Sequence, residues 1–252
     1  MPILLLILRL PVLILHILIG LFTIIFFPKE TRYFKHIHYS IMMLWMRFLS
    51  FILGIKVDIR GTPDLSADLY VSNHVTYLDI IIINKLLPVN FIAKEAISSW
   101  PIIGVLASKT GTLFIKRGDN VESTKMIHEM EERFKIKNKI VFFPEGKIGN
   151  GIRVKKFHYK LFKSIENKDL SIQPIAIRYP RGYPQDNNYS EMISNKSEKG
   201  EMISLYLKFL MRRKSHVILL FLDKVSTRDC ENETVANVLA EKINDALDNL
   251  NS

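Results

Sequence analysis

The chain has 252 residues and a formal net charge of +10, from 35 Lys and Arg residues against 25 Asp and Glu residues. Its 48% hydrophobic content excludes a disordered chain, and its length suits one α/β domain, or a domain with a membrane element, that buries a sizeable core. The single cysteine, Cys230, excludes a disulfide framework and a thiolate-rich metal site. The positive charge indicates an anionic partner or surface: nucleic acid, anionic lipid, a phosphate-bearing substrate or an acidic carrier protein.

The N-terminal residues 3–27 are almost entirely apolar, and a run of this length matches the ~20 residues that cross a bilayer core. The run lacks the basic cluster and the cleavage site of a secretory signal peptide. A spanning helix and a helix held in one leaflet both fit it, with Arg9 near its end. Lys29, Arg32 and Lys35 follow at once. They predict a membrane location with the rest of the chain on the cytoplasmic face.

A second apolar stretch covers residues 39–54 and contains only one charged residue, Arg47. It is too short to cross a bilayer comfortably. An interfacial helix, a partner for the first segment and an ordinary core helix all fit this pattern. We therefore expect residues 1–54 to form membrane-anchoring helices and residues 55–252 to form one further domain.

From residue 55 onward, short apolar runs typical of strands alternate with longer stretches typical of helices. Strands are predicted at residues 55–60, 69–71, 89–93, 112–115, 139–143, 171–178 and 217–222. Helices are predicted at residues 78–87, 97–108, 121–137, 156–167, 201–214 and 233–250. Pro174 favours an edge position or an irregularity in its strand, and the polar run 180–200 predicts a long loop. This alternation predicts an α/β fold with a mixed, largely parallel sheet flanked by helices, behind an N-terminal membrane-associated helical hairpin.

Several common catalytic motifs are absent from the sequence. There is no G-x-S-x-G elbow for a hydrolase serine, and no phosphate-binding glycine loop for a nucleotide cofactor. Neither an H-E-x-x-H motif nor a Cys/His cluster indicates zinc. We expect no cofactor, no metal and, without a basic recognition element, no nucleic-acid partner.

A histidine and an aspartate stand five residues apart where the predicted strand 69–71 ends. Open α/β sheets bind ligands at such strand ends. In one continuous helix, residues five apart lie ~140° apart around the axis, at ~100° per residue. His74 and Asp79 therefore meet only if His74 precedes the helix and Asp79 lies in its first turn. Thr76 is a good N-cap for that arrangement, since Asp79 follows it in capping-box spacing.

Two interpretations of this pair remain open. In the first, Asp79 only caps a helix and His74 is an ordinary turn histidine. In the second, Asp79 accepts a hydrogen bond from one ring nitrogen of His74, and the other ring nitrogen is left as a general base. No serine or cysteine nucleophile stands beside the pair. The second interpretation therefore fits direct attack by a substrate hydroxyl.

Two other strand ends carry polar residues. Glu145 and Gly146 follow an apolar strand, with Lys147 and further cations at positions 153–156 that suit phosphate groups. Lys116 and Arg117 end the strand predicted at residues 112–115. Each fragment taken alone is equally consistent with a plain turn or with surface charge.

Together and in this order, these fragments resemble the glycerolipid acyltransferase family, which contains 1-acylglycerol-3-phosphate acyltransferase. Residues 73–79 resemble its NHx4D motif, and residues 111–117 resemble its second block. Residues 143–146 resemble its FPEG block, and residues 172–176 resemble its fourth block, centred on Pro174. The likeness covers roughly residues 40–225, including the segment 94–104 between the first two blocks. One departure follows FPEG, where the family's usual Thr-Arg-Ser is replaced by Lys-Ile-Gly-Asn-Gly.

The resemblance implies transfer of a fatty acyl group from acyl-CoA or acyl carrier protein, as co-substrate, to a lysolipid hydroxyl. It implies His74 as general base and Asp79 as its orienting partner. The leading acceptor is 1-acylglycerol-3-phosphate, which gives phosphatidic acid, with membrane lipids as the surroundings. The departure after FPEG leaves open another acceptor such as lyso-ornithine lipid, and a non-catalytic lipid-binding protein of the same fold is the remaining alternative. The residues expected to contact substrate are Asn73, Thr76, Lys116, Arg117, Glu145, Gly146, Lys147 and Pro174.

Overall fold

The computed structural model describes residues 2–116, 120–154, 156–165, 168–180, 199–229 and 235–251. Arg117, Cys230 and most of the loop predicted at residues 180–200 lie outside these ranges. The interpretations given above for these residues stay predictions.

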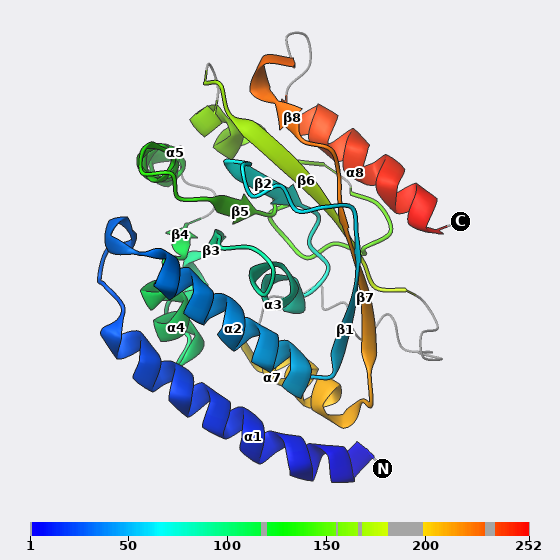
Figure 1. Ribbon diagram of the computed structural model, residues 1–252. Coiled ribbons are helices and arrows are strands. Elements are labelled where there is room, and N and C mark those ends of the chain that lie inside the picture. Colours follow the sequence, from blue (N-terminus) through cyan, green and yellow to red (C-terminus); the bar gives the residue numbers. More distant parts are fainter. Residues whose placement is uncertain are drawn as a thin grey trace.

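Eight strands form one mixed sheet in the order β1-β7-β6-β2-β5-β3-β4, with β8 paired to β6 (Figure 1). Neighbouring strands are parallel, except where β6 meets β7 and β8. Strands β2 to β6 therefore run in one direction, and their carboxyl ends meet at one edge of the sheet. The strands are β1 (Ile55–Arg60), β2 (Leu69–Ser72), β3 (Asn90–Lys94), β4 (Leu113–Ile115), β5 (Ile140–Phe142), β6 (Ser171–Arg178), β7 (Ser215–Phe221) and β8 (Val225–Ser226).

Helices cover both faces of this sheet, which confirms the predicted fold class. Helices α1 to α4 and α7 lie on one side, while α5, α8 and the 3-10 helix η4 lie on the other (Figure 1). The helices are α1 (Pro2–Thr23), α2 (His36–Ile52), α3 (Leu78–Asn84), α4 (Ile103–Lys109), α5 (Asn120–Lys135), α7 (Lys199–Met211) and α8 (Val235–Asn251). The 3-10 helices are η1 (Ile24–Phe26), η2 (Thr31–Tyr33), η3 (Glu95–Ile97), η4 (Tyr159–Ile165) and η5 (Thr227–Asp229).

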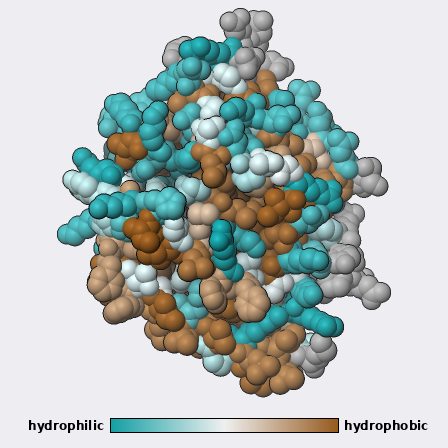
Figure 2. Space-filling view, viewed as in Figure 1, coloured by the Kyte–Doolittle hydropathy of each residue, from teal (hydrophilic) through white to brown (hydrophobic). Residues whose placement is uncertain are grey.

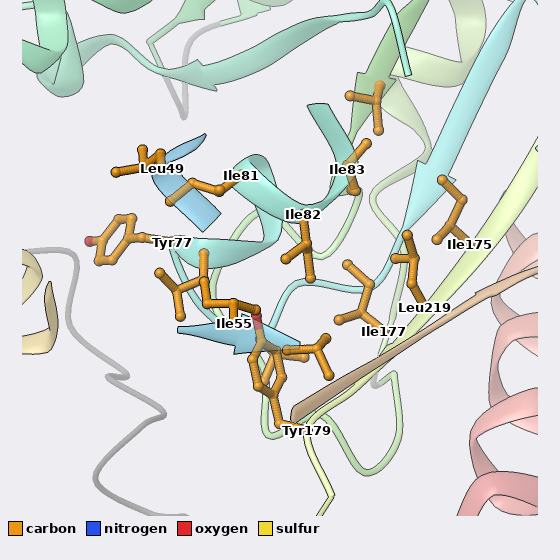
Figure 3. Packing of buried hydrophobic residues seen from close by; sticks show 14 of the residues in the cluster. Leu49, Ile55, Tyr77, Ile81, Ile82, Ile83, Ile175, Ile177, Tyr179 and Leu219 are labelled. Carbon is orange, nitrogen blue, oxygen red and sulfur yellow. The ribbon is translucent and has the colours of Figure 1, made fainter. Parts of the chain in front are cut away.

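Each face has its own apolar core, because successive side chains of a strand point to opposite sides. On β6, Ile175 and Ile177 belong to the core under α3, while Ile172 and Ala176 belong to the core under α8. Helix α3 is buried nearly all round, as its run of isoleucines requires. In Figure 3, Ile82 of α3 faces Ile177 of the sheet. The start of α3 is therefore held rigidly against the sheet.

The largest differences from the predicted helices are at residues 97–108 and 156–167. The helix predicted at residues 97–108 begins only at Ile103, because the chain makes a tight turn at Ile102, whose φ is +65° and whose flanking N–H and C=O groups bond to each other. The helix predicted at residues 156–167 is a short 3-10 helix, η4.

Pro174 lies in a central strand, so the predicted edge position is wrong, while the predicted irregularity is present. Strand β6 pairs with β8 up to Ile172 and with β7 from Ile175 onward. Pro174 faces the break between these two partners, where its carbonyl accepts the N–H of Leu222. Because the N–H and C=O of a strand residue point to the same side, the N–H that proline lacks would also face this break.

The N-terminal helices share the core with the rest of the chain. Leu53, just after α2, is completely buried, and Trp45 of α2 lies against Gly20 of α1 and stacks on His16. Arg9 of α1 donates to three carbonyls at the end of α7, those of Leu210, Arg212 and Arg213. The last carbonyls of a helix have no hydrogen-bond partner within the helix and carry partial negative charge, so they attract a cation such as this guanidinium.

The outward side of α1 is apolar and uncovered. Ile7 and Phe22 are 62% and 64% exposed, and apolar side chains gather along the lower edge of Figure 2, over α1. By length and composition, the segment Pro2–Phe26 is long and apolar enough to cross a membrane. An exposed apolar stripe of this size indicates contact with lipid or another apolar partner.

We predict that Gly20→Leu separates α1 from α2. A Cβ at this position would lie 2.7 Å from Nε1 of Trp45. Overpacking costs about 1–3 kcal/mol, which exceeds the gain of about 0.8 kcal/mol in helix propensity. Thermal unfolding in detergent should show a lower midpoint than the wild type. The control Ile19→Leu, on the exposed side of α1, should unfold like the wild type; an unchanged midpoint for Gly20→Leu would contradict this packing.

Candidate active site

The side chains of His74 and Asp79 meet at the carboxyl edge of the sheet. Nδ1 of His74 lies 2.8 Å from Oδ2 of Asp79. Helix α3 begins at Leu78, so His74 precedes the helix and Asp79 lies in its first turn, as the spacing requires. A carboxylate only accepts hydrogen bonds, so Nδ1 carries the hydrogen, and a neutral imidazole then keeps its lone pair on Nε2.

The imidazole plane is set by a second contact. Phe143, directly after β5, stacks on His74 with ring centroids 4.1 Å apart and 14° between the planes. Phe91 of β3 stacks behind Phe143 at 6.3 Å. The His74 side chain is 15% exposed, and within the described ranges no hydrogen bond reaches its Nε2. This nitrogen is therefore available to a substrate.

Two carboxylates bind the backbone of the histidine loop. Oδ2 of Asp79 accepts the N–H groups of Val75 at 2.6 Å and Thr76 at 3.0 Å, and Oε1 of Glu145 accepts the N–H of His74 at 2.9 Å. The predicted N-cap bond from the Thr76 hydroxyl is wrong: Oγ1 is buried, and no partner for it lies in the described part of the chain. The N–H of Asp79, which that hydroxyl would accept, donates instead to the carbonyl of Thr76 at 3.0 Å. The other half of the predicted capping box is present, since Asp79 accepts the N–H of Thr76.

The other oxygen of Asp79 has a partner from far along the chain. Oη of Tyr179, the residue after β6, donates to Oδ1 of Asp79 at 2.9 Å. No sequence pattern pointed to Tyr179, because it lies 100 residues from Asp79. Phe143 stood inside the FPEG block, but its contact with His74 depends on strand order, which the sequence alone does not give.

Glu145 lies beneath the histidine loop. Burial raises the pKa of the Glu145 carboxyl, and the N–H of His74 and the charge of Lys147 oppose this shift. The chain after FPEG folds back here, since the N–H of Gly149 donates to the carbonyl of His74 at 2.6 Å. A Cβ at Gly149 would lie 2.7 Å from Oε2 of Glu145. The Lys-Ile-Gly run that replaces the family's usual residues thus brings a glycine into a place with no room for a side chain.

The other predicted contact residues lie in different surroundings. The Asn73 amide is buried and bonds both the N–H and the C=O of Ile177, at 2.8 and 2.9 Å. It holds the histidine loop to β6, and its expected contact with substrate stays a prediction. Lys116 and Lys147 are exposed, and Gly146 adopts a φ of +66° in the turn after β5. Pro174 is buried within the sheet.

An apolar cavity of about 430 Å³ lies between the sheet and the helices α1, α2, α3, α4 and α7. His74 does not line the cavity, but Tyr77 and Phe91 do. Phe91 stacks on Phe143, the ring that stacks on His74. The polar amides of Asn84 and Asn90 in its wall are bonded to backbone carbonyls. The cavity therefore offers an almost wholly apolar surface near the dyad, the pair His74 and Asp79. Its volume suits a small-molecule site.

Comparisons with known proteins find similarity to acyltransferases. Residues 56–178 match the family model described as Acyltransferase. A lyso-ornithine lipid O-acyltransferase of Pseudomonas aeruginosa is 34% identical over 54% of this chain and 53% of that protein. A 1-acyl-sn-glycerol-3-phosphate acyltransferase of Neisseria gonorrhoeae is 29% identical over 50% of each chain. The chain therefore matches about half the length of these relatives.

A solved structure shares the whole fold. The 1-acyl-sn-glycerophosphate (LPA) acyltransferase PlsC of Thermotoga maritima matches with a TM-score of 0.71 and 15% identity, over 99% of this chain and 96% of that one. Residues 56–178 thus match an Acyltransferase domain in sequence, and the whole chain matches the fold of one such protein. This similarity to glycerolipid acyltransferases is the one that the motifs predicted.

We predict that Glu145→Gln changes the pH dependence of stability. The raised pKa of Glu145 means that the unfolded chain loses this proton first as pH rises. The wild type therefore loses stability between the unfolded-state and folded-state pKa values, whereas glutamine does not titrate. The unfolding midpoint of Glu145→Gln minus that of the wild type should be more positive at pH 8 than at pH 4. For the exposed control Glu241→Gln this difference should not change; a pH-independent result for Glu145→Gln would contradict the burial argument.

Proposed function

We propose that this protein is a membrane-bound O-acyltransferase that moves a fatty acyl group from acyl-CoA or acyl carrier protein to a lysolipid hydroxyl. The observation that carries the proposal is the His74–Asp79 pair with its accessible Nε2. A thioester is already activated, so the protein mainly has to position the hydroxyl and accept its proton. No covalent acyl-enzyme is needed.

The proposed reaction has two proton transfers through one nitrogen. Nε2 of His74 takes the proton of the lysolipid hydroxyl while that oxygen attacks the thioester carbonyl carbon. The imidazolium that forms is stabilised by Asp79, 2.8 Å away. When the tetrahedral intermediate collapses, the C–S bond breaks and the thiolate takes the proton from Nε2. The products are the diacyl lipid and the free thiol, and His74 is again neutral.

The apolar cavity suits a fatty chain. Its wall reaches Tyr77, three residues beyond His74, and then follows α3 away from the catalytic edge. An acyl chain in this cavity would be removed from water along its length, with its carbonyl end near the dyad. We therefore assign the cavity to an acyl chain of one of the two lipid substrates.

The first candidate acceptor is 1-acylglycerol-3-phosphate, which would give phosphatidic acid. Lys116, directly after β4, and Lys147, in the chain after β5, are exposed, and the sequence adds Arg117. Cations in such a place suit a phosphate headgroup. The name of the Neisseria relative specifies this acceptor.

A second candidate acceptor is lyso-ornithine lipid. The names of relatives from Pseudomonas aeruginosa and Rhodobacter capsulatus, 34% and 33% identical, specify it. In addition, residues 147–151 carry Lys147 but not the arginine that the family usually has after FPEG. Lysine binds phosphate as a point charge and lacks the paired N–H groups of arginine, so this change favours a headgroup other than phosphate.

We predict that His74→Ala lowers kcat by about 10²–10⁴-fold, the usual contribution of a general base, while the unfolding midpoint and vesicle binding stay at wild-type values. Purified protein should be assayed with both candidate acceptors and with both acyl-CoA and acyl carrier protein as donors. The preferred acceptor is the one with the higher kcat/KM. Wild-type activity of His74→Ala, or no turnover by the wild type with any acceptor, would refute the proposal.

We further propose that α1 lies in the plane of one leaflet and does not span the bilayer. Arg9 near its start bonds to the end of α7, and Ile24 and Phe27 just after it are buried against the domain. A spanning orientation would carry the domain packed along this helix into the hydrocarbon, where its polar surface has no partners. A helix lying flat exposes only its apolar outer side to lipid.

We predict that Ile7→Ser with Phe22→Ser weakens binding to lipid vesicles by at least about 10-fold, because each buried apolar side chain contributes about 1.5–3 kcal/mol. Flotation with phosphatidylcholine vesicles measures the bound fraction. The control Ile136→Ser with Tyr159→Ser changes two exposed apolar side chains away from α1 and should bind like the wild type. Equal loss in both variants would contradict a specific lipid contact of α1.

A further inference from the structure

We infer that Tyr179 is a positioning residue for the catalytic pair, an inference that rests on the function proposed above. It acts through Asp79: its hydroxyl donates to Oδ1, while His74 bonds to Oδ2. Tyr179 is thus separated from the imidazole by one carboxylate. We assign it the task of holding that carboxylate in the plane that His74 requires.

The three other donors to Asp79 restrain its carboxylate from one side only. They come from His74, Val75 and Thr76, and all of them reach the same oxygen, Oδ2. The rotation of a carboxylate about its last bond has broad energy minima, and hydrogen bonds at one oxygen tolerate part of that rotation by stretching and bending. A donor on Oδ1 restrains the rotation from the opposite side, and the described structure supplies it through Tyr179.

The hydroxyl of Tyr179 is itself held in place by the sheet. Side chains alternate along β6, so Ile175, Ile177 and Tyr179 point to the face that carries α3, and all three belong to its core. The Tyr179 ring is 2% exposed, and Figure 3 shows it among these core side chains. Ile177 lies two residues before Tyr179, and the Asn73 amide bonds both its N–H and its C=O. The histidine loop and the end of β6 are thereby kept in register.

Chemistry also favours this pairing. Asp79 is fully buried, and a buried carboxylate needs a donor for each oxygen. A tyrosine hydroxyl buried in an apolar core needs an acceptor in the same way. Each group thus satisfies the other. Without the hydroxyl, Oδ1 would face the apolar core or turn toward one of the donors that now bind Oδ2, and the His74 bond would lengthen or bend.

The test compares Tyr179→Phe with a matched control, Tyr70→Phe, in full-length protein. Tyr70 is also fully buried, but its hydroxyl donates to the backbone carbonyl of Asp64 at 2.8 Å. For Tyr179→Phe we expect kcat to fall by about 10- to 100-fold, the usual loss when a residue that orients a metal-bound histidine through a hydrogen bond is replaced. KM for both substrates should change by less than about 2-fold. Tyr70→Phe should keep kcat within about 2-fold. Both variants should unfold at similar temperatures.

A double-mutant cycle shows whether Tyr179 acts through the carboxylate. In an Asp79→Asn background, Tyr179→Phe should change kcat by less than about 2-fold, because the group that it positions has been replaced. If the double variant is too slow to measure, the split between kcat and KM decides alone. His74→Ala and wild type are assayed in parallel, so a failure of the proposed function appears in those arms.

Three results would overturn the inference. The first is wild-type kcat for Tyr179→Phe while His74→Ala is inactive. The second is the same loss of kcat in the Asp79→Asn background as in the wild type. The third is unfolding of Tyr179→Phe where Tyr70→Phe stays folded, which would make the hydroxyl a stability contact only.

Discussion

The candidate active site of this protein depends on one buried carboxylate, that of Asp79. Asp79 is fully buried and accepts four hydrogen bonds, from His74, Val75, Thr76 and Tyr179. A carboxylate cannot remain charged in an apolar core without such partners, so the loop before α3 and the end of β6 must converge on it. The direction of the imidazole follows from the same requirement. Removing the carboxylate would leave the N–H groups of Val75 and Thr76 and the hydroxyl of Tyr179 without this acceptor.

The fold brings the remaining groups to this point by strand direction alone. Because β2 to β6 run the same way, the residues that follow β2, β5 and β6 meet at one edge without any further device. The next layer, α3, is enclosed between this sheet and α2, so the residue in its first turn has little freedom. The apolar cavity opens on the same side of the sheet. The polar side chains of His74 and Asp79 and the apolar wall of the cavity are therefore separated by only one helix, α3.

Local patterns in the sequence predicted what depends on local geometry. The spacing of His74 and Asp79 required a loop before a helix, and the alternation of apolar runs predicted the sheet. Contacts between distant segments were beyond such patterns. Tyr179 reaches Asp79 across 100 residues, and Arg9 reaches Arg212 across 203. Pro174 predicted an edge position or an irregularity, and only the strand order, with its break between β7 and β8, shows that the irregularity is the case here.

The docking of Arg9 onto α7 affects how this protein can be handled in the laboratory. Deleting the first helix is a common way to obtain a shortened chain that stays in aqueous buffer. Here the deletion would leave the carbonyls of Leu210, Arg212 and Arg213 without their guanidinium. It would also remove a wall of the cavity, to which Leu10 and Leu13 belong. The shortened chain would present an open hydrophobic trough to water, so the intact chain in detergent or a nanodisc is the proper material for enzymology and crystallisation.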